Sequence, residues 1–363
     1  MTTVDLVWFN AGGGHRAAAM ALEQVMQSQG SPWRVRRINL TEVLDKDALF
    51  RRLTGIEPED LYNKRLASGF TLGLAQELKV LQGLIRLSHG ALVQRLARPG
   101  VPFVTVLTDM ADHPPHFWIE PGLAQHVVCG TDHAVAQALQ AGCDPARVHR
   151  ASGMILRPAF YFGAPVDREA ERRRLGLDAH MPTGLVMFGG TGSRVMKRIT
   201  TRLPTTPLIL MCGRNPTLAQ ALRAQAAQAP RVVVEFTPDV QRWMQLADFF
   251  IGKPGPGALS EAVQQGLPVI VTHNAWTMPQ ERWNTRWVQQ HGLGIVQRSF
   301  ATVQAAVDTL TRDLRSYRDR VGLMDNRAVF EVPRILERIL AQSKAQAQAQ
   351  AAPAKSPVAV TSI

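Results

Sequence analysis

Two side chains in the first third of the sequence could exchange a proton at neutral pH, His15 and Asp109. His15 follows three glycines in the stretch NAGGGH (10–15), and Asp109 ends the apolar run VTVLTD. An imidazole titrates near pH ~6.5, so His15 can accept a proton in neutral solution. Asp109 could orient that histidine or act as the base itself. We rank His15 first and Asp109 second as the base; the alternative is that His15 begins a helix and binds phosphate without proton transfer.

Two more histidines, His113 and His116, lie in the loop after Asp109. They could serve the same site or be ordinary loop residues. Together with His126 and Cys129 they could also be read as zinc ligands, but this spacing matches no standard structural zinc pattern. We therefore expect no metal and no other cofactor.

Four glycine-rich turns could bring backbone N–H groups close to a phosphate. They are NAGGGH (10–15), FGGTGS (188–193), CGRN (212–215) and GKPGPG (252–257). A helix N-terminus offers unpaired N–H groups and partial positive charge, and glycine allows the backbone a close approach. Glycine also serves strand–helix turns for packing alone, so one such loop is weak evidence. The sequence has neither the dinucleotide fingerprint with its acidic partner nor a P-loop.

The last of these turns opens a predicted helix. Pro256 suits the first turn of a helix, and Gly255 and Gly257 would keep that turn open for a phosphate. Glu261 lies about one turn further on, where a carboxylate could accept hydrogen bonds from paired hydroxyl groups, as on a ribose. The alternative is that Glu261 is a solvated helix residue.

Alternating strand and helix patterns must position these residues. Apolar runs predict strands at 4–10, 33–40, 101–109 and 126–131, and helical spacing predicts a helix over 15–29. Five more short apolar runs follow in the second half of the chain. Strand–helix alternation favours parallel sheets with crossover helices. We predict two doubly wound α/β domains that face each other across a cleft.

The domain boundaries follow from breaks in this alternation. Prolines, glycines and a charge cluster in 157–178 indicate an interdomain linker. A low-complexity stretch rich in Ala, Gln and Pro ends the chain and is expected to be disordered. We predict an N-terminal domain at 1–160, a C-terminal domain at 165–322, a closing helix at 325–340 interrupted near Pro333, and a disordered tail at 341–363.

Composition and charge limit the class of protein. The 363 residues carry a formal net charge of +12. This charge could attract nucleic acid, an anionic lipid surface or a phosphate-bearing substrate, or it could reflect a solvated surface rich in arginine. No nucleic-acid-binding motif occurs, so we expect no nucleic-acid partner. Three scattered cysteines fit a reducing compartment. No signal peptide and no apolar run of about 18 residues is present, so we expect a cytoplasmic protein, or one that lies on a membrane without crossing it.

Several segments, taken together and in order, resemble a known family. They are GGGHRAAA (12–19), VLTDMADHPPHFW (106–118), RPAF (157–160), MCGRN (211–215), ADFFIGKPGPGALSEAVQQGLPVIV (247–271) and PQERWN (279–284). They resemble the monogalactosyldiacylglycerol-synthase-type branch of glycosyltransferase family 28, which includes bacterial diacylglycerol glycosyltransferases. The resemblance implies a GT-B fold, in which two Rossmann-like domains face a cleft. The C-terminal domain would hold the UDP-sugar and the N-terminal domain the acceptor.

The resemblance also implies roles for single residues. Glu261 would bind the ribose hydroxyls, Gln280 and Glu281 would contact the sugar, and His15 would face the anomeric carbon. His113 and His116 would lie on the acceptor side. Further donor contacts would come from Gly14, Gly189, Gly190, Thr191, Arg214, Lys253, Gly255, Pro256 and Gly257.

The implied reaction is inverting transfer of galactose or glucose from UDP-galactose or UDP-glucose to diacylglycerol or a related lipid. The basic and apolar segment 50–96 could bind the anionic inner surface of the cell membrane, or form a helix pair in the domain core. Two other functions stay open: another lipid-linked transferase of the family, of the N-acetylglucosaminyl type, and a non-catalytic nucleotide-sugar-binding protein.

Overall fold

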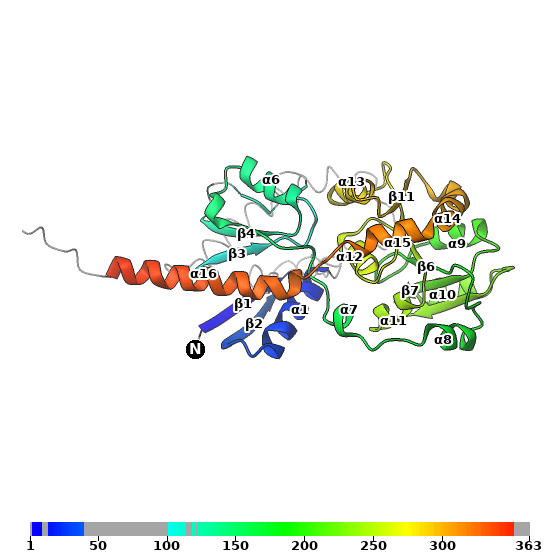
Figure 1. Cartoon of the computed structure of the whole chain (residues 1–363), viewed down its shortest axis with the longest axis horizontal. Coiled ribbons are helices and arrows are strands. Elements are labelled where there is room, and N and C mark those ends of the chain that lie inside the picture. The colour runs from blue at the N-terminus through cyan, green and yellow to red at the C-terminus, as the bar shows by residue number, and fades with distance from the viewer. Residues whose placement is uncertain are drawn as a thin grey trace, which may run out of the picture.

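The computed structural model describes residues 2–8, 14–39, 101–113, 118–120, 122 and 124–351. These residues form two α/β lobes that lie side by side (Figure 1). Every strand pairing in them is parallel, which confirms the predicted α/β class. The predicted membrane-facing segment 50–96 and His116 lie outside the described residues.

The second lobe is built on one parallel sheet with the strand order β11-β10-β9-β6-β7-β8. The strands are β6 (Gly184–Met187), β7 (Leu208–Gly213), β8 (Arg231–Glu235), β9 (Phe249–Gly252), β10 (Val269–Thr272) and β11 (Gly294–Gln297). The first two connections run from β6 towards β8, and the chain then returns to β9 on the other side of β6. The order therefore reverses between β6 and β9, as in doubly wound dinucleotide-binding sheets.

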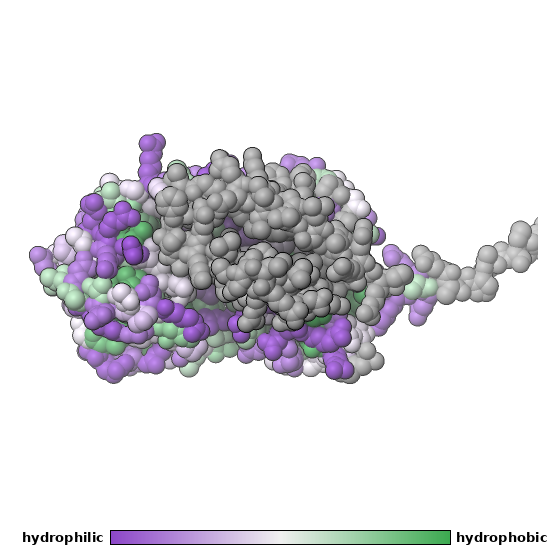
Figure 2. Space-filling view, turned by 180° about the vertical axis from the view of Figure 1, so that it is seen from behind, coloured by the Kyte–Doolittle hydropathy of each residue, from purple (hydrophilic) through white to green (hydrophobic). Residues whose placement is uncertain are grey.

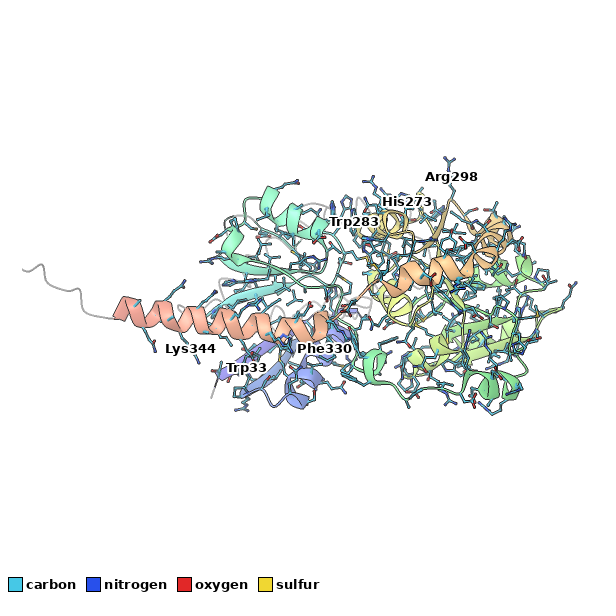
Figure 3. The ribbon with its side chains drawn as sticks, viewed as in Figure 1. Trp33, His273, Trp283, Arg298, Phe330 and Lys344 are labelled. Atoms are coloured by element: carbon cyan, nitrogen blue, oxygen red, sulfur yellow. The ribbon has the colours of Figure 1, made fainter. Side chains whose placement is uncertain are left out.

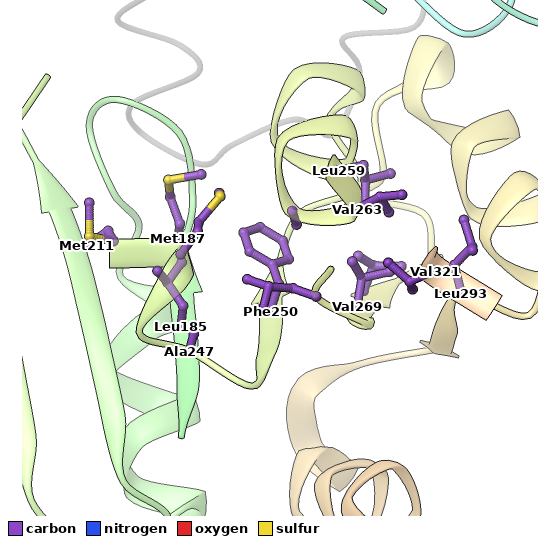
Figure 4. Close-up of a cluster of buried hydrophobic side chains, with 14 of the residues drawn as sticks. Leu185, Met187, Met211, Ala247, Phe250, Leu259, Val263, Val269, Leu293 and Val321 are labelled. Atoms are coloured by element: carbon purple, nitrogen blue, oxygen red, sulfur yellow. The ribbon is translucent and has the colours of Figure 1, made fainter. Parts of the chain in front are cut away.

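Helices cover both faces of this sheet. One face packs against α11 (Val240–Gln245), α12 (Pro256–Gln264), α13 (Arg282–Gln290) and α15 (Leu314–Gly322). The other face packs against α9 (Val195–Arg202), α10 (Pro216–Arg223), η3 (Phe300–Thr302) and α14 (Val303–Arg312). Alternate residues of β6 supply the two cores: Leu185 and Met187 belong to one cluster and Val186 to the other. The first cluster, with Phe250 at its centre, is shown in Figure 4. From behind, the described surface of this lobe is mainly hydrophilic (Figure 2).

The first lobe holds two smaller parallel sheets. Its elements are β1 (Thr2–Trp8), α1 (Gly14–Ser28), β2 (Trp33–Asn39), β3 (Phe103–Val106), β4 (Gln125–Cys129), α6 (Asp132–Gln140), η1 (Pro145–Arg147) and β5 (Val148–Arg150). The predicted helix over 15–29 is confirmed, and Leu22, Val25 and Met26 on its inner face are buried. Neither β5 nor β11 was predicted, since VHR and GIVQ lack the longer apolar run that marked the predicted strands.

The predicted linker at 157–178 is too long. It contains α7 (Ala159–Phe162) and α8 (Arg168–Arg174), and α8 belongs to the second lobe. The buried guanidinium of Arg172 forms an ion pair of 2.5 Å with Asp248 and donates to the Leu246 carbonyl. Part of the charge cluster that was predicted as linker therefore attaches α8 to the second lobe through a buried contact. The prediction failed because a local sequence pattern does not reveal a partner 76 residues away.

The closing helix returns the chain to the first lobe. Helix α16 (Ala328–Ala351) packs on α1 through Val329, Val332 and Ile335 (Figures 1 and 3). The predicted end at residue 340 and the predicted disorder from 341 are wrong as far as residue 351, because alanine and glutamine have high helix propensity. Pro333 does not interrupt the helix. None of the described helices is long and apolar enough to cross a membrane.

Candidate active site

Three of the predicted glycine turns meet at one edge of the second sheet. β6 and β9 are neighbours and end in register, with Met187 opposite Gly252. The turn FGGTGS follows β6, GKPGPG follows β9, and CGRN closes β7. In open parallel sheets a ligand binds outside the carboxyl ends of the strands where the strand order reverses, which is this position.

The turns after β6 and β7 are joined by backbone contacts. Gly213 has φ +59°, and a Cβ atom there would lie 2.2 Å from the carbonyl oxygen of Gly190. The Arg214 N–H donates to that same oxygen at 2.8 Å. Asn215, which was not predicted as a site residue, donates from Nδ2 to the Thr191 carbonyl at 3.1 Å. The Arg214 guanidinium lies 3.7 Å from the centre of the Phe236 ring, so its side chain is held beside the turn.

The start of α12 is arranged as the sequence predicted. Gly255 is the N-cap residue and Pro256 the first residue of the helix. No side chain caps this end, and an added Cβ at Gly257 would meet no atom within 4 Å, so the backbone borders open space. The first N–H groups of a helix without a capping side chain can bind an anion.

An ion pair with a buried carboxylate lies beside this helix start. Lys253 Nζ donates to Glu281 Oε1 at 2.7 Å, and the Glu281 side chain is 6% exposed. A Cβ atom on Gly255 would come within 3.3 Å of the same carboxylate oxygen, so glycine leaves room for the pair. Glu281 ends the short helix η2 (Pro279–Glu281). Within the described residues, the buried Oε1 of the adjacent Gln280 has no hydrogen-bond partner.

Glu261 lies in the middle of α12 and is half-buried. Burial raises the pKa of its carboxyl to about 7, and the positive charge of Arg157 opposes this only partly. A carboxyl in this environment gains from hydroxyl donors, because they replace the lost hydration of the charged form. The arrangement suits the predicted contact with paired hydroxyl groups.

His15 is positioned by a residue that the sequence analysis did not single out. Its Nδ1 lies 2.9 Å from the Thr108 hydroxyl, and the Trp118 ring meets it edge-on at 5.8 Å between ring centres. Asp109, predicted as a possible orienting group, does not make this contact. Burial lowers the pKa of His15, which favours the neutral imidazole. When Nδ1–H donates to Thr108, Nε2 is free to accept a proton.

Asp109 lies directly after Thr108 and titrates near neutrality. Burial is the largest cause that raises the pKa of its carboxyl to about 7; the charge of Glu281 adds to the shift and that of Lys253 opposes it. These charges belong to the second lobe, so Asp109 lies within electrostatic reach of the Lys253–Glu281 pair. A carboxyl that titrates near the working pH can serve as a general acid or base.

His113 lies in the same interlobe region. Burial lowers its pKa, and the positive charges of Arg282 and Arg286 on α13 lower it further. Nearby, the His133 ring of α6 stacks on the Trp283 ring of α13, with 4.6 Å between centres and 5° between planes. The stack is a direct contact between the lobes.

The structure separates two of the four residues in the alternative zinc reading, His126 and Cys129. They lie three residues apart on β4 and therefore point to opposite faces of the sheet. His126 Nδ1 is 3.0 Å from His149 Nε2, and Cys129 is fully buried, where its thiol pKa rises to about 12. No group of three potential metal-ligating side chains occurs among the described residues.

Comparison with known proteins tests the family resemblance. No protein-family model matches the chain. A probable monogalactosyldiacylglycerol synthase 2 of Oryza sativa subsp. indica is 30% identical over 261 residues, which are 67% of this chain and 54% of that protein. The resemblance to the monogalactosyldiacylglycerol synthases is confirmed. The chain spans about half the length of this synthase.

Solved structures confirm the fold. Acinetobacter baumannii MurG superimposes with a TM-score of 0.54 at 18% identity, covering 93% of this chain and 100% of that one. Anabaena HepE in complex with UDP-glucose superimposes with a TM-score of 0.55 at 13% identity, covering 93% and 99%. The chain has the GT-B fold, as predicted.

Proposed function

We propose that this chain is an inverting glycosyltransferase that moves a hexose from a UDP-sugar to diacylglycerol or a related lipid. One observation carries the proposal. Asp109 of the first lobe lies within electrostatic reach of the Lys253–Glu281 pair beside the glycine turns of the second, and His15 contacts Thr108, the residue before Asp109. A nucleotide site and a base on opposite lobes are the two parts that a sugar transfer needs.

The UDP-sugar is assigned to the second lobe. The diphosphate binds the backbone N–H groups of Gly189, Gly190 and Thr191 and of the α12 start, with Lys253 and Arg214 supplying positive charge. Glu261 accepts from the ribose hydroxyls. The hexose contacts the Glu281 carboxylate and the Gln280 amide, whose Oε1 has no partner among the described residues.

Inversion follows from attack on the face of the sugar opposite to the UDP. The base takes the proton of the lipid hydroxyl as its oxygen bonds to C1, the bond from C1 to the diphosphate oxygen breaks, and UDP leaves with the electron pair. His15 Nε2 or the Asp109 carboxylate takes that proton. No metal is needed for this step, since lysine, arginine and backbone N–H groups meet the leaving-group charge.

The relatives support galactose as the donor sugar and diacylglycerol as the acceptor, because they are named for that product. UDP-glucose is the alternative donor. We assign the protein to the cytoplasmic face of the inner membrane, where segment 50–96 and the net charge of +12 would hold it on anionic lipid.

The test is product analysis. The chain is incubated with diacylglycerol in anionic vesicles and UDP-galactose, UDP-glucose or UDP-N-acetylglucosamine, with and without EDTA, and the lipids are analysed by mass spectrometry. We expect a hexosyl diacylglycerol of inverted anomeric configuration that forms equally well in EDTA and is lost in Asp109→Asn and His15→Ala. Transfer of N-acetylglucosamine alone would favour the other lipid-linked activity, and UDP binding without any product would favour a non-catalytic binding protein.

A further inference from the structure

A cavity of about 330 Å³ lies between the lobes beside the proposed reaction site. Met110, the residue after Asp109, lines it, as do the loop after β4 and the helices α12 and α13. Cavities of this size at the contact between two domains are common sites for small ligands. Neither the proposed nucleotide contacts nor the proposed base line this cavity.

One wall of the cavity is aromatic. Trp283 and Trp287 lie one helical turn apart on α13 and both line it, with His291 a further turn along. The stack of His133 on Trp283 holds this wall in place from the other lobe, and Figure 3 shows Trp283 on the side of α13 towards that lobe. Tryptophan presents a large, rigid apolar face, which matches the C–H face of a pyranose ring.

The α12 wall is polar. Ser260 and Gln264 line it, and within the described residues the Oε1 atom of Gln264 is buried without a hydrogen-bond partner. A buried acceptor without a donor is unfavourable, and rotation of the Gln264 amide into the cavity would let a ligand hydroxyl supply that donor. Gln290 adds a second amide at the exposed side of the cavity.

We propose that this cavity binds one hexose ring, apart from the nucleotide-sugar site. The C–H face of the ring lies on the Trp283–Trp287 wall, and a ring hydroxyl donates to Gln264 Oε1. Because both lobes line the cavity, a bound ring contacts both of them. A free sugar and the headgroup of a glycolipid present the same ring, and this binding goes beyond the proposed transfer reaction.

The test is calorimetric titration of the full chain with methyl β-D-galactopyranoside and methyl β-D-glucopyranoside, in the presence of saturating UDP. Gln264→Leu and Trp287→Ala should each weaken the affinity by about tenfold or more, which is the loss of one good polar or aromatic contact. Gln264→Met is the substitute if leucine disturbs folding. The matched control is Gln289→Leu, an exposed residue of α13 outside the cavity, and it should bind like the parent.

Unchanged glycoside affinity in both cavity variants, or no glycoside binding by a chain that binds UDP, would overturn the proposal. Glycoside binding by a chain that does not bind UDP would support the cavity and overturn the proposed function instead. Flotation with phosphatidylcholine vesicles, with and without galactosyl diacylglycerol, separates the two sources of the ring. If recovery of the protein with the vesicles requires both the glycolipid and Gln264, the ring belongs to a glycolipid headgroup. If the protein binds the glycosides but does not float with glycolipid vesicles, the ligand is a free sugar.

Discussion

Replacing Asp109 by asparagine should stabilise the fold while it abolishes sugar transfer. The folded environment raises the pKa of this carboxyl from 3.8 to about 7, chiefly through burial. Between these pH values the folded chain keeps a proton that the unfolded chain has released. The stability contributed by the protonated carboxyl is therefore fully present below pH 3.8 and is lost as pH rises through about 7.

The size of the effect follows from that interval. Each pH unit corresponds to about 1.4 kcal/mol, so complete ionisation of Asp109 costs the folded state on the order of 4 kcal/mol. Asparagine has nearly the same shape and carries no charge, so the cost is absent at every pH. The free energy of unfolding of Asp109→Asn should exceed that of the parent, and this difference should increase by about 3 kcal/mol between about pH 5 and about pH 8.5.

Urea unfolding, followed by tryptophan fluorescence over this pH range, measures the gain. Asp319→Asn, on the exposed side of α15, is the matched control and should follow the parent at every pH. A difference between Asp109→Asn and the parent that stays constant with pH would refute the reasoning, because it would show that the charge on Asp109 carries no cost in the folded protein.

Three further predictions concern the groups around the site. Thr108→Val should lower kcat by about tenfold with little change in the KM for UDP-sugar, whereas Thr108→Ser should keep most of the activity in steady-state assays. Glu281→Gln should move the acidic limb of the pH–rate profile to lower pH and Lys253→Met to higher pH, because the charge of Glu281 raises the pKa of Asp109 and the charge of Lys253 lowers it, and each variant removes one of these effects. Gly213→Ala should cost at least about 2 kcal/mol in urea unfolding and weaken UDP binding, since its Cβ meets a carbonyl oxygen. Gly176→Ala, also at positive φ but in open space, should cost about 1 kcal/mol.

Signals that reside within a few neighbouring residues were predictable from the sequence. The start of α12 is one example, since Pro256 after Gly255 specifies a helix start by local geometry alone. The apolar periodicity of α1 is another. Parallel α/β architecture then brings the glycine turns to one edge of a sheet, because parallel strands all end on the same side.

Features that depend on distant partners were not predictable. Thr108 positions His15 across 93 residues, and no local pattern marks a threonine for that contact. The pKa of Asp109 depends on its burial and on charges of the opposite lobe, neither of which the run VTVLTD reveals. The end of α16 was missed for a different reason: its alanine- and glutamine-rich composition was taken as a sign of disorder, although those residues favour a helix.

The return of α16 to the first lobe has a consequence for how the chain is made. The second sheet comes from one uninterrupted stretch, Gly184 to Gln297, and can form as soon as that stretch leaves the ribosome. The apolar side of α1, with Leu22, Val25 and Met26, packs partly on strands of its own lobe, and its cover is complete only when Ile339 has emerged. The lobe that is synthesised first is thus completed last, and during translation it is the part of the nascent chain that most needs protection by a chaperone.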